Sequence, residues 1–426
     1  MTESTRGIPR REFLKAAVAI GGTAALSACL DRGDSPDVAT GPDDLSALPE
    51  RQHAWNDVLS TDDHGNVLAA RHKVLLYFDY AGSGTPSASE REQVESALQS
   101  LERAYERGNQ GLLFTVGYSP SYFDRFDGTL PDAVDLPAPE ALAPFEDPKP
   151  DTQDVVINLA SDHAPVVLAA EEALLGNRDS LNGVDVEASL SGVLKRVDRR
   201  TGFVGEGLPA DNQDVQGIPD SEPVPDEAPL YMGFKSGFKK NQASEERVTI
   251  QEGPFADGTT QHVSKLRLHL DQWYEQDSRD QRVAKMFCPA HAAEDRVEGV
   301  GNNLGTDSAM DDECTENVTE YAREQGMVGH SQKSATARED DSPLILRRDF
   351  DSTDGGEAGL HFLALQRTIG DFADTRKAMN GTDVAEESSV GQRVNNGILQ
   401  YMTVERRGNF LLPPRSHRAL PSPNPS

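Results

Sequence analysis

The stretch over 329–367 constrains this chain more than any other part of it. A lone histidine, His330, precedes an apolar run that closes on two arginines, Arg347 and Arg348. The run over 360–365 is apolar on both faces, which predicts a strand at the centre of a sheet. Alone, the histidine is typical of a loop or core residue, and the arginines of a solvated strand end. Their order beside a buried strand is what indicates a site.

The first part of the chain alternates apolar strands with helical patterns. A short apolar run over 72–80 predicts a buried strand. Residues 87–90 read Ser-Ala-Ser-Glu, a capping box, and apolar residues at helical spacing follow it. A second strand is predicted over 111–117, a third over 154–160 and a helix over 165–175. Strands that return through short connections predict an α+β fold with helices packed on one face of the sheet.

The second part resumes after a loop over 205–230 that is rich in Pro, Asp, Glu and Gly. A loop of this length in a compact domain is usually functional or disordered. Residues 258–273 alternate leucines with polar residues, which predicts a half-buried strand that ends in a tryptophan. A helix is predicted over 369–379.

The order of these motifs resembles the dye-decolourising (DyP-type) haem peroxidases over roughly residues 72–380. Residues 111–126, GLLFTVGYSPSYFDRF, are similar to the family's strand that ends in a Gly-Tyr/Phe-x-Pro turn. The strand over 258–273 is similar to another family strand. The resemblance implies two ferredoxin-like halves of the dimeric α+β barrel type, over 71–200 and 201–412. Their antiparallel sheets would carry helices outside, and the second half would hold most of the haem.

The same resemblance implies roles for individual residues. His330 would be the axial ligand of the iron of haem b, and Arg347 would lie over the distal face. Such a site needs an imidazole to hold the iron, and distal groups that move a proton and stabilise charge as the O–O bond breaks. Arg348 would meet a haem propionate or a carboxylate. Asp349 would orient the arginine from beside it.

The family's distal acid lies in a Gly-x-x-Asp-Gly motif, which is altered in this chain. The matching stretch over 201–209 keeps Gly202 and Phe203, but the aspartate position falls on Gly205. Glu206, one residue later, is the candidate acid/base that would replace it. Proton transfer requires hydrogen-bond distance or one bridging water. The alternative is that Glu206 is a solvated turn residue.

The function that this resemblance implies is an exported, haem-dependent peroxidase. It would reduce hydrogen peroxide and oxidise an unknown electron donor, and the resemblance admits a homo-oligomer. Two alternatives remain open. One is a catalytically degenerate surface haem-binding protein, and the other is a binding module whose pocket has closed.

The N-terminus is typical of a processing signal and not of a fold. Arg10 and Arg11 begin a twin-arginine signature, an apolar stretch follows over 16–26, and Leu-Ser-Ala-Cys ends at Cys29. We expect 1–29 to direct twin-arginine export and the cysteine to carry a lipid. The lipid would anchor the protein to the outer face of the cytoplasmic membrane, at the cell surface. An uncleaved anchor helix is the alternative.

Two further segments are predicted to be disordered from their composition. Residues 30–70 are rich in Asp, Pro, Gly and Ser and would tether the domain to the lipid, and 413–426 would form a free tail. The net charge is -30, from 71 acidic and 41 basic residues, of which only 11 are lysine. This balance argues against a nucleic-acid partner. It favours a halophilic protein over an ordinary acidic one.

Two cysteines remain after Cys29. Outside the cell, Cys288 and Cys314 could form a disulfide, and a disulfide and free thiols are both open interpretations. A metal site that adds His291 is the weaker interpretation, because these ligands are scattered through acidic loops.

Overall fold

Ten strands form one sheet in the computed structural model, which describes residues 36–425 except residue 311. Two small two-stranded sheets lie outside it. The strands of the large sheet are β1 (His72–Tyr80), β2 (Leu113–Tyr118), β3 (Lys149–Pro150), β4 (Val155–Ser161), β7 (Leu194–Phe203), β8 (Thr259–Leu268), β11 (Leu346–Arg347), β12 (Phe350–Ser352), β13 (Gly359–Gln366) and β14 (Met402–Leu412). The small sheets pair β5 (Ser180–Leu181) with β6 (Val184–Asp185) and β9 (Arg338–Glu339) with β10 (Ser342–Pro343).

Eight of these strands close into a barrel made of two similar halves. The first half has the order β7-β1-β4-β2 and the second the order β14-β8-β13-β12, all antiparallel. In each half the first strand lies between the last and the third, which is the ferredoxin-like order. The expected α+β fold with a duplicated ferredoxin-like unit is therefore confirmed. The predicted boundary at 200/201 falls inside β7, so the first half extends three residues further, to Phe203.

The two halves meet at two narrow seams. At one seam Leu411 of β14 lies opposite Tyr118 of β2, and at the other Asp351 of β12 lies opposite Phe203 of β7. A Cβ atom on Gly202 would lie 2.0 Å from the carbonyl oxygen of Asp351. Only glycine allows the strands to approach this closely. The glycine kept from the family's motif therefore closes the barrel.

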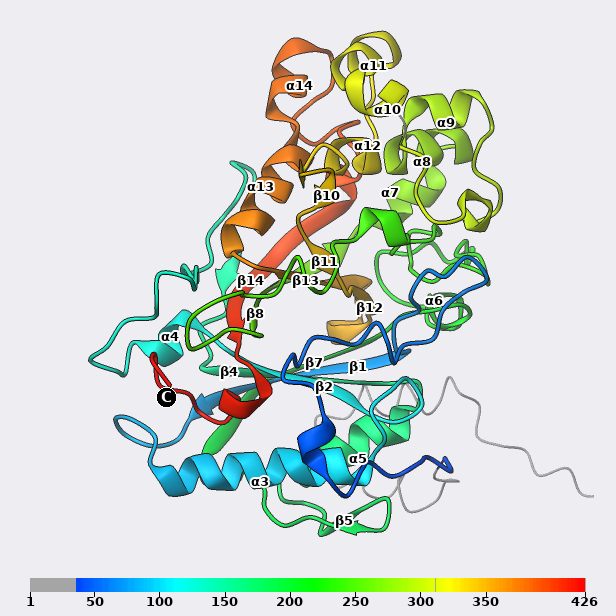
Figure 1. The fold of residues 1–426 in the computed structure, drawn as a ribbon. Helices are drawn as coiled ribbons and strands as arrows, with labels where there is room; N and C mark the ends of the chain where they lie inside the picture. The colour runs from blue at the N-terminus through cyan, green and yellow to red at the C-terminus, as the bar shows by residue number, and fades with distance from the viewer. Residues whose placement is uncertain (1–35, 311, 426) are drawn as a thin grey trace, which may run out of the picture.

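Helices cover the outer faces of both halves (Figure 1). On the first half, α3 (Ala88–Ala104) and α5 (Ala164–Leu174) pack on the strands, and α4 (Pro120–Phe123) follows β2. The helices of the second half and of the connection to it are α6 (Leu208–Asp211), α7 (Leu270–Glu275), α8 (Arg279–Met286), α9 (Pro289–Ala293), α10 (Asp312–Glu316), α11 (Val318–Gln325), α12 (His330–Ser334), α13 (Ile369–Asn380) and α14 (Thr382–Glu387). Short 3₁₀ turns lie at Leu45–Ala47, Lys239–Asn241, Asn302–Leu304, Asp354–Gly356, Leu399–Tyr401 and Arg415–His417.

The apolar segments form the elements that the sequence predicts. The capping box at the start of α3 is present, because the side chain of Ser87 accepts from the N–H of Glu90 and the Glu90 carboxylate accepts in return. The apolar face of this helix, with Val94, Leu98 and Leu101, is buried against the sheet. The interior of the barrel is a separate apolar cluster.

Two of the long strands, β7 and β14, were not predicted, because their sequences carry charges that the fold buries. In β7, Arg200 is 2% exposed and donates to both carboxylate oxygens of Asp151, at 2.6 and 2.8 Å. In β14, Arg407 is equally buried and donates to Glu146 at 2.8 Å. A buried arginine with such a partner interrupts the apolar pattern of a strand without breaking the strand.

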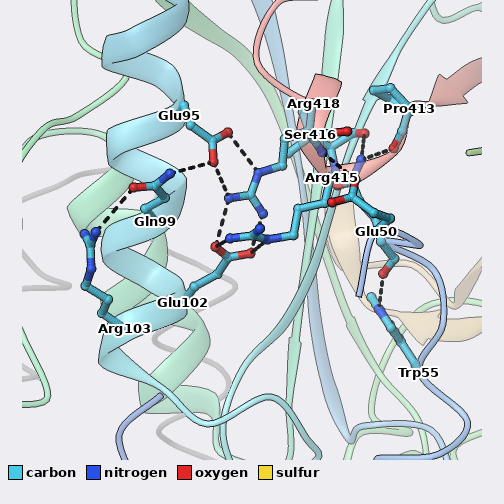
Figure 2. A network of polar contacts seen from close by, with 12 residues as sticks. Glu50, Trp55, Glu95, Gln99, Glu102, Arg103, Pro413, Arg415, Ser416 and Arg418 are labelled. Carbon is cyan, nitrogen blue, oxygen red and sulfur yellow. Dashed lines mark hydrogen bonds and ion pairs between the residues drawn. The ribbon is translucent and has the colours of Figure 1, made fainter. Parts of the chain in front are cut away.

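The predictions of a disordered tether and tail are wrong for the described residues. Within 36–70, Trp55 is 2% exposed and packs against Leu113 of β2. In the tail, Leu420 is buried, and Arg418 pairs with the carboxylates of two residues of α3, Glu95 and Glu102 (Figure 2). The composition suggested disorder because arginines and prolines usually lie in solvent. Here the arginine side chain instead pairs with carboxylates of α3.

The predicted signal over 1–29, with Cys29, lies outside the described residues. No helix in the described part of the chain combines the length and the apolar content needed to span a bilayer.

Candidate functional site

A large cavity lies on the outer face of the second-half sheet. Its walls are β8, β13 and β14 on one side, α12 and α13 on the other, and the loop over 230–241. The empty space between these walls, counted together with the open mouth, is about 1540 Å³. The walls are mostly apolar and include Phe234, Leu266, Leu268, Phe287, Phe362 and Met402. Such a cavity suits a large, largely apolar ligand.

His330 lines this cavity as the first residue of α12. Burial, with the nearby cations Arg347 and Lys333, lowers the pKa of the His330 imidazole to about 3. The ring is therefore neutral at physiological pH, the form in which histidine binds a metal. None of the described residues forms a hydrogen bond with this ring.

Two glycines set the position of the histidine. A Cβ atom on Gly329 would lie 1.8 Å from the carbonyl oxygen of Phe287, so α12 approaches the end of α8 as only glycine permits. On the other side, a Cβ atom on Gly397 would lie 3.1 Å from the Cα of His330, and its φ of +62° also favours glycine. The glycine before the histidine is thus a close-packing residue.

Of the two interpretations that the sequence left open, a disulfide or free thiols, the structure has the disulfide, and it lies next to α12. Cys288 and Cys314 are bonded, and both are buried. The amide of Gln332, in α12, donates to the carbonyl oxygen of Cys314 at 2.6 Å. The disulfide therefore links the start of α9 to α10, and the bond from Gln332 links α10 to the helix that carries His330. His291 lies within 4.8 Å of both sulfurs, but the sulfurs bond each other, so the metal interpretation is not supported.

Arg347 and Asp349 face the cavity from the opposite wall, together with Asp351. These residues alternate along β11 and β12, so they share one face of the strand. The side chain of Gln242 accepts from the N–H of Arg347 at 2.9 Å and donates to its carbonyl oxygen at 3.2 Å, which holds the backbone in place. The guanidinium of Arg347 has no hydrogen bond or ion pair within the described chain. It is available to an anionic or polar ligand.

The two aspartates are unusual because they are carboxylates in a mostly apolar wall. Burial raises the pKa of Asp349 to about 6, although Arg347 and Lys73 act against it. Burial also raises the pKa of Asp351, and the neighbouring Asp349 adds to the shift. Oδ1 of each residue has no partner among the described residues. Asp351 was missed in the sequence, although its spacing of two from Asp349 predicts the same face.

Arg348 does not line the cavity, which corrects its assignment to cofactor binding. It points to the other face of the strand, where it donates to Glu245 at 2.8 Å and lies over the ring of Trp55. Of the two partners expected from the sequence, a propionate or a carboxylate, the structure provides the carboxylate. The strand period could have shown this, because Arg347 and Arg348 must point to opposite faces.

Glu206 is also not in the cavity, which corrects its assignment as the acid/base. Its side chain is exposed at the turn after β7, and its backbone carbonyl accepts from Arg71 at 3.0 Å. None of residues 201–209 lines the cavity. The altered motif therefore builds the seam of the barrel and leaves this glutamate in solvent.

Two arginines that the sequence did not single out lie at a polar part of the cavity. Arg376 of α13 and Arg407 of β14 both donate to Glu146, at 2.6 and 2.8 Å. Nη1 of Arg376 and Nε of Arg407 are buried and have no partner in the described residues. These N–H groups remain free to bind the acidic groups of a ligand.

Over residues 70–414 the sequence matches a family of unknown function, DUF7405. No curated protein matches it.

Solved structures with a similar fold are DyP-type proteins. A dye-decolourising protein from V. cholerae has a TM-score of 0.54 at 13% identity, over 86% of this chain and 99% of that chain. The encapsulated DyP-type peroxidase from Mycobacterium smegmatis has a TM-score of 0.55 at 14% identity, over 86% of this chain and 100% of that chain. A DypB variant from Rhodococcus jostii in complex with haem has a TM-score of 0.52 at 14% identity, over 87% of this chain and 99% of that chain. The fold is that of the DyP-type proteins.

Proposed function

Because this chain belongs to DUF7405, a family of unknown function, and has the fold of the dye-decolourising peroxidases, we propose that it is a haem-dependent peroxidase. Its substrates would be hydrogen peroxide and an external electron donor. One observation carries the proposal: a large apolar cavity has the neutral imidazole of His330 on its helical wall and the unpaired guanidinium of Arg347 on its sheet wall. The open cavity does not fit the alternative of a closed pocket.

The residues of the cavity fit haem b. Haem has a large apolar ring and two carboxylates, and the cavity has apolar walls with one polar part. His330 would ligate the iron, and the unpaired N–H groups of Arg376 and Arg407 would bind the propionates. When bound, haem would supply the electrons that break the O–O bond. Asp349 lines the same cavity and would lie beside the bound haem. It forms no hydrogen bond with the guanidinium of Arg347, so it does not orient the arginine in the way that the resemblance implies.

The proposed role of Arg347 follows from the charge of its guanidinium, which forms no hydrogen bond or ion pair with the described residues. As the O–O bond of hydrogen peroxide breaks, negative charge develops on the departing oxygen. A fixed cation in a largely apolar cavity stabilises that charge more strongly than water does. The backbone clamp by Gln242 restricts where the guanidinium can lie.

Peroxide turnover tests the proposal. We expect the haem-loaded protein to oxidise guaiacol with hydrogen peroxide faster, by about 10²-fold or more, than the same concentration of free haem, because positioned acid–base groups contribute this much. The measurement is the initial rate at fixed salt and pH, with heat-denatured protein plus haem as the control. A rate equal to that of free haem would contradict the peroxidase and leave the second candidate.

The second candidate is a surface haem-binding protein without turnover. The exposed position of Glu206 favours it. The altered motif places no acid in the cavity, because none of residues 201–209 lines it. Stoichiometric haem binding with no turnover above that of free haem would identify this function.

We further propose that the protein acts outside the cell. The twin-arginine signature and Cys29 support export and a lipid anchor on the outer face of the cytoplasmic membrane. The net charge of -30 and the few lysines support a role in strong brine and no nucleic-acid partner.

A further inference from the structure

The cavity holds two carboxylates that no earlier step of the proposed function uses as proton carriers. Among the described residues that line it, Asp349 and Asp351 are the acidic ones. Peroxide cleavage needs a group that takes a proton from one oxygen and gives it to the other. The sequence candidate for this role, Glu206, faces solvent outside the cavity.

We propose that Asp349 is the acid/base that moves the proton of hydrogen peroxide in this cavity. The inference rests on the proposed peroxidase function and deepens it. Asp349 stands two residues from Arg347 on the same face of the strand. The charge-stabilising cation and the proton carrier would therefore reach the same part of the cavity.

Geometry favours Asp349 over Asp351. Asp351 is 1% exposed, and its Oδ2 accepts from the N–H of Tyr231 at 2.6 Å, so this side chain is held in the wall. Asp349 is only partly buried, and Oδ1 lacks a partner in both aspartates, so exposure and the bond from Tyr231 distinguish them. A proton carrier must reach its substrate directly or through one water, and Asp349 has the freer carboxylate.

The charges around Asp349 support this role. It is faced by Arg347 of β11, Lys73 of β1 and Asp351 of β12, and His330 and Arg376 line the helical wall across the cavity. Burial outweighs the two cations and raises the pKa of Asp349 to about 6. A base of this pKa is ionised at neutral pH and remains a useful acid after it has taken a proton. Below pH 6 it would be protonated and could not accept.

The proton transfer balances as follows. The carboxylate of Asp349 accepts the proton of one peroxide oxygen, and the protonated carboxyl then gives it to the other oxygen, which leaves as water when the O–O bond breaks. A bound haem would supply the two electrons for this cleavage, and a one-electron donor, such as a phenol, would return them in two steps. Over a turnover, one hydrogen peroxide, two electrons and two protons give two molecules of water.

The test compares Asp349→Asn with Glu206→Gln in the haem-loaded protein. We expect Asp349→Asn to lower the rate constant for peroxide by about 10²–10⁴-fold, with the haem absorption band retained. The residual rate should lose the rise through pH 6 that the unaltered protein shows. Glu206→Gln should match the unaltered protein in both respects. Cyanide binding gives a readout besides activity, because hydrogen cyanide must lose its proton to bind, so Asp349→Asn should also slow it.

Each outcome is decisive. If the rates with peroxide and with cyanide are equal in Asp349→Asn and in the unaltered protein, Asp349 is not the acid/base. The proposed peroxidase function would still hold in that case, because the protein turns over peroxide. A slower rate with an unchanged pH profile and unchanged cyanide binding would show a positioning residue and also overturn it. No haem binding by the unaltered protein would overturn the peroxidase and this inference together. A large loss in Glu206→Gln alone would return the role to the glutamate.

Discussion

Replacing Arg347 by leucine is expected to lower peroxide turnover by about 10²–10³-fold, the loss typical of removing one preorganised charge-stabilising group. The guanidinium lines the cavity and has no ion pair or hydrogen bond within the described chain. No carboxylate therefore forms an ion pair with it, although Asp349 lies close enough for its pKa to respond to this charge. Because Gln242 holds the backbone of Arg347 through both its N–H and its carbonyl oxygen, the fold of the wall should survive the substitution. The measurement is the rate constant for peroxide with the haem absorption band recorded in parallel.

The matched control is Arg323→Leu, which removes the same group from an exposed pair with Glu387. This variant should keep its turnover, because the pair is on the surface and far less effective electrostatically. Arg347→Lys should recover part of the loss, since the charge remains without the planar fork. Turnover of Arg347→Leu within a few-fold of the control would refute the role of the arginine.

The second large effect is on the free energy of unfolding, and it comes from a residue outside the cavity lining. Glu102 of α3 binds two arginines of the C-terminal segment, with Arg415 at 2.7 Å and Arg418 at 2.9 Å (Figure 2). Despite burial, which acts in the other direction, these cations lower the pKa of Glu102. Glu102→Ala would leave a buried guanidinium without this partner, and breaking a buried ion pair typically costs about 3–5 kcal/mol. We expect the free energy of unfolding to fall by about 3 kcal/mol, at the low end, because Glu95 still pairs with Arg418.

Urea unfolding at fixed salt measures this effect, with Glu387→Ala as the control. The control removes a carboxylate whose pair is more than half exposed, so its cost should stay below about 1 kcal/mol. Proteolysis should also release the segment after residue 413 faster in Glu102→Ala. Equal unfolding free energies in the two variants would show that the network does not hold the C-terminal segment.

The pH dependence of this network has a defined sign. The pKa of Glu102 is lower in the folded protein than in the unfolded chain. The stability that this carboxylate contributes is therefore present above the unfolded pKa, near 4.5, and is lost as the pH falls through the folded value. The difference between the unaltered protein and Glu102→Ala should shrink in acid.

The sequence predicted the parts of the fold whose pattern is apolar. The buried strands β1 and β4 and the capping box of α3 follow from apolar runs and turn residues. The pair of ferredoxin-like halves was implied by the family resemblance. Strands β7 and β14 were missed because Arg200 and Arg407 interrupt the pattern, and their partners lie far along the chain. No local signal could show that these charges are paired inside.

The site was predicted in part for a similar reason. His330 and Arg347 come to one cavity, and both belong to a recognisable order of motifs. Glu206 was chosen by its position in an altered motif, and only the three-dimensional arrangement shows that it faces solvent. The two-residue period of a strand would have separated Arg348 from Arg347 and placed Asp349 on the side of Arg347. Arg376 and Arg407 reach the cavity from distant elements, which the sequence does not reveal.

The central claim is that the cavity binds haem through His330, and a titration of the protein with haem in high salt tests it most directly. We predict a sharp Soret band that saturates at one haem per chain, is lost in His330→Ala and returns when free imidazole is added. His64→Ala, which changes an exposed histidine, should bind as the unaltered protein does. A folded protein with no stoichiometric band, or a His330→Ala variant with an unchanged band, would contradict the claim.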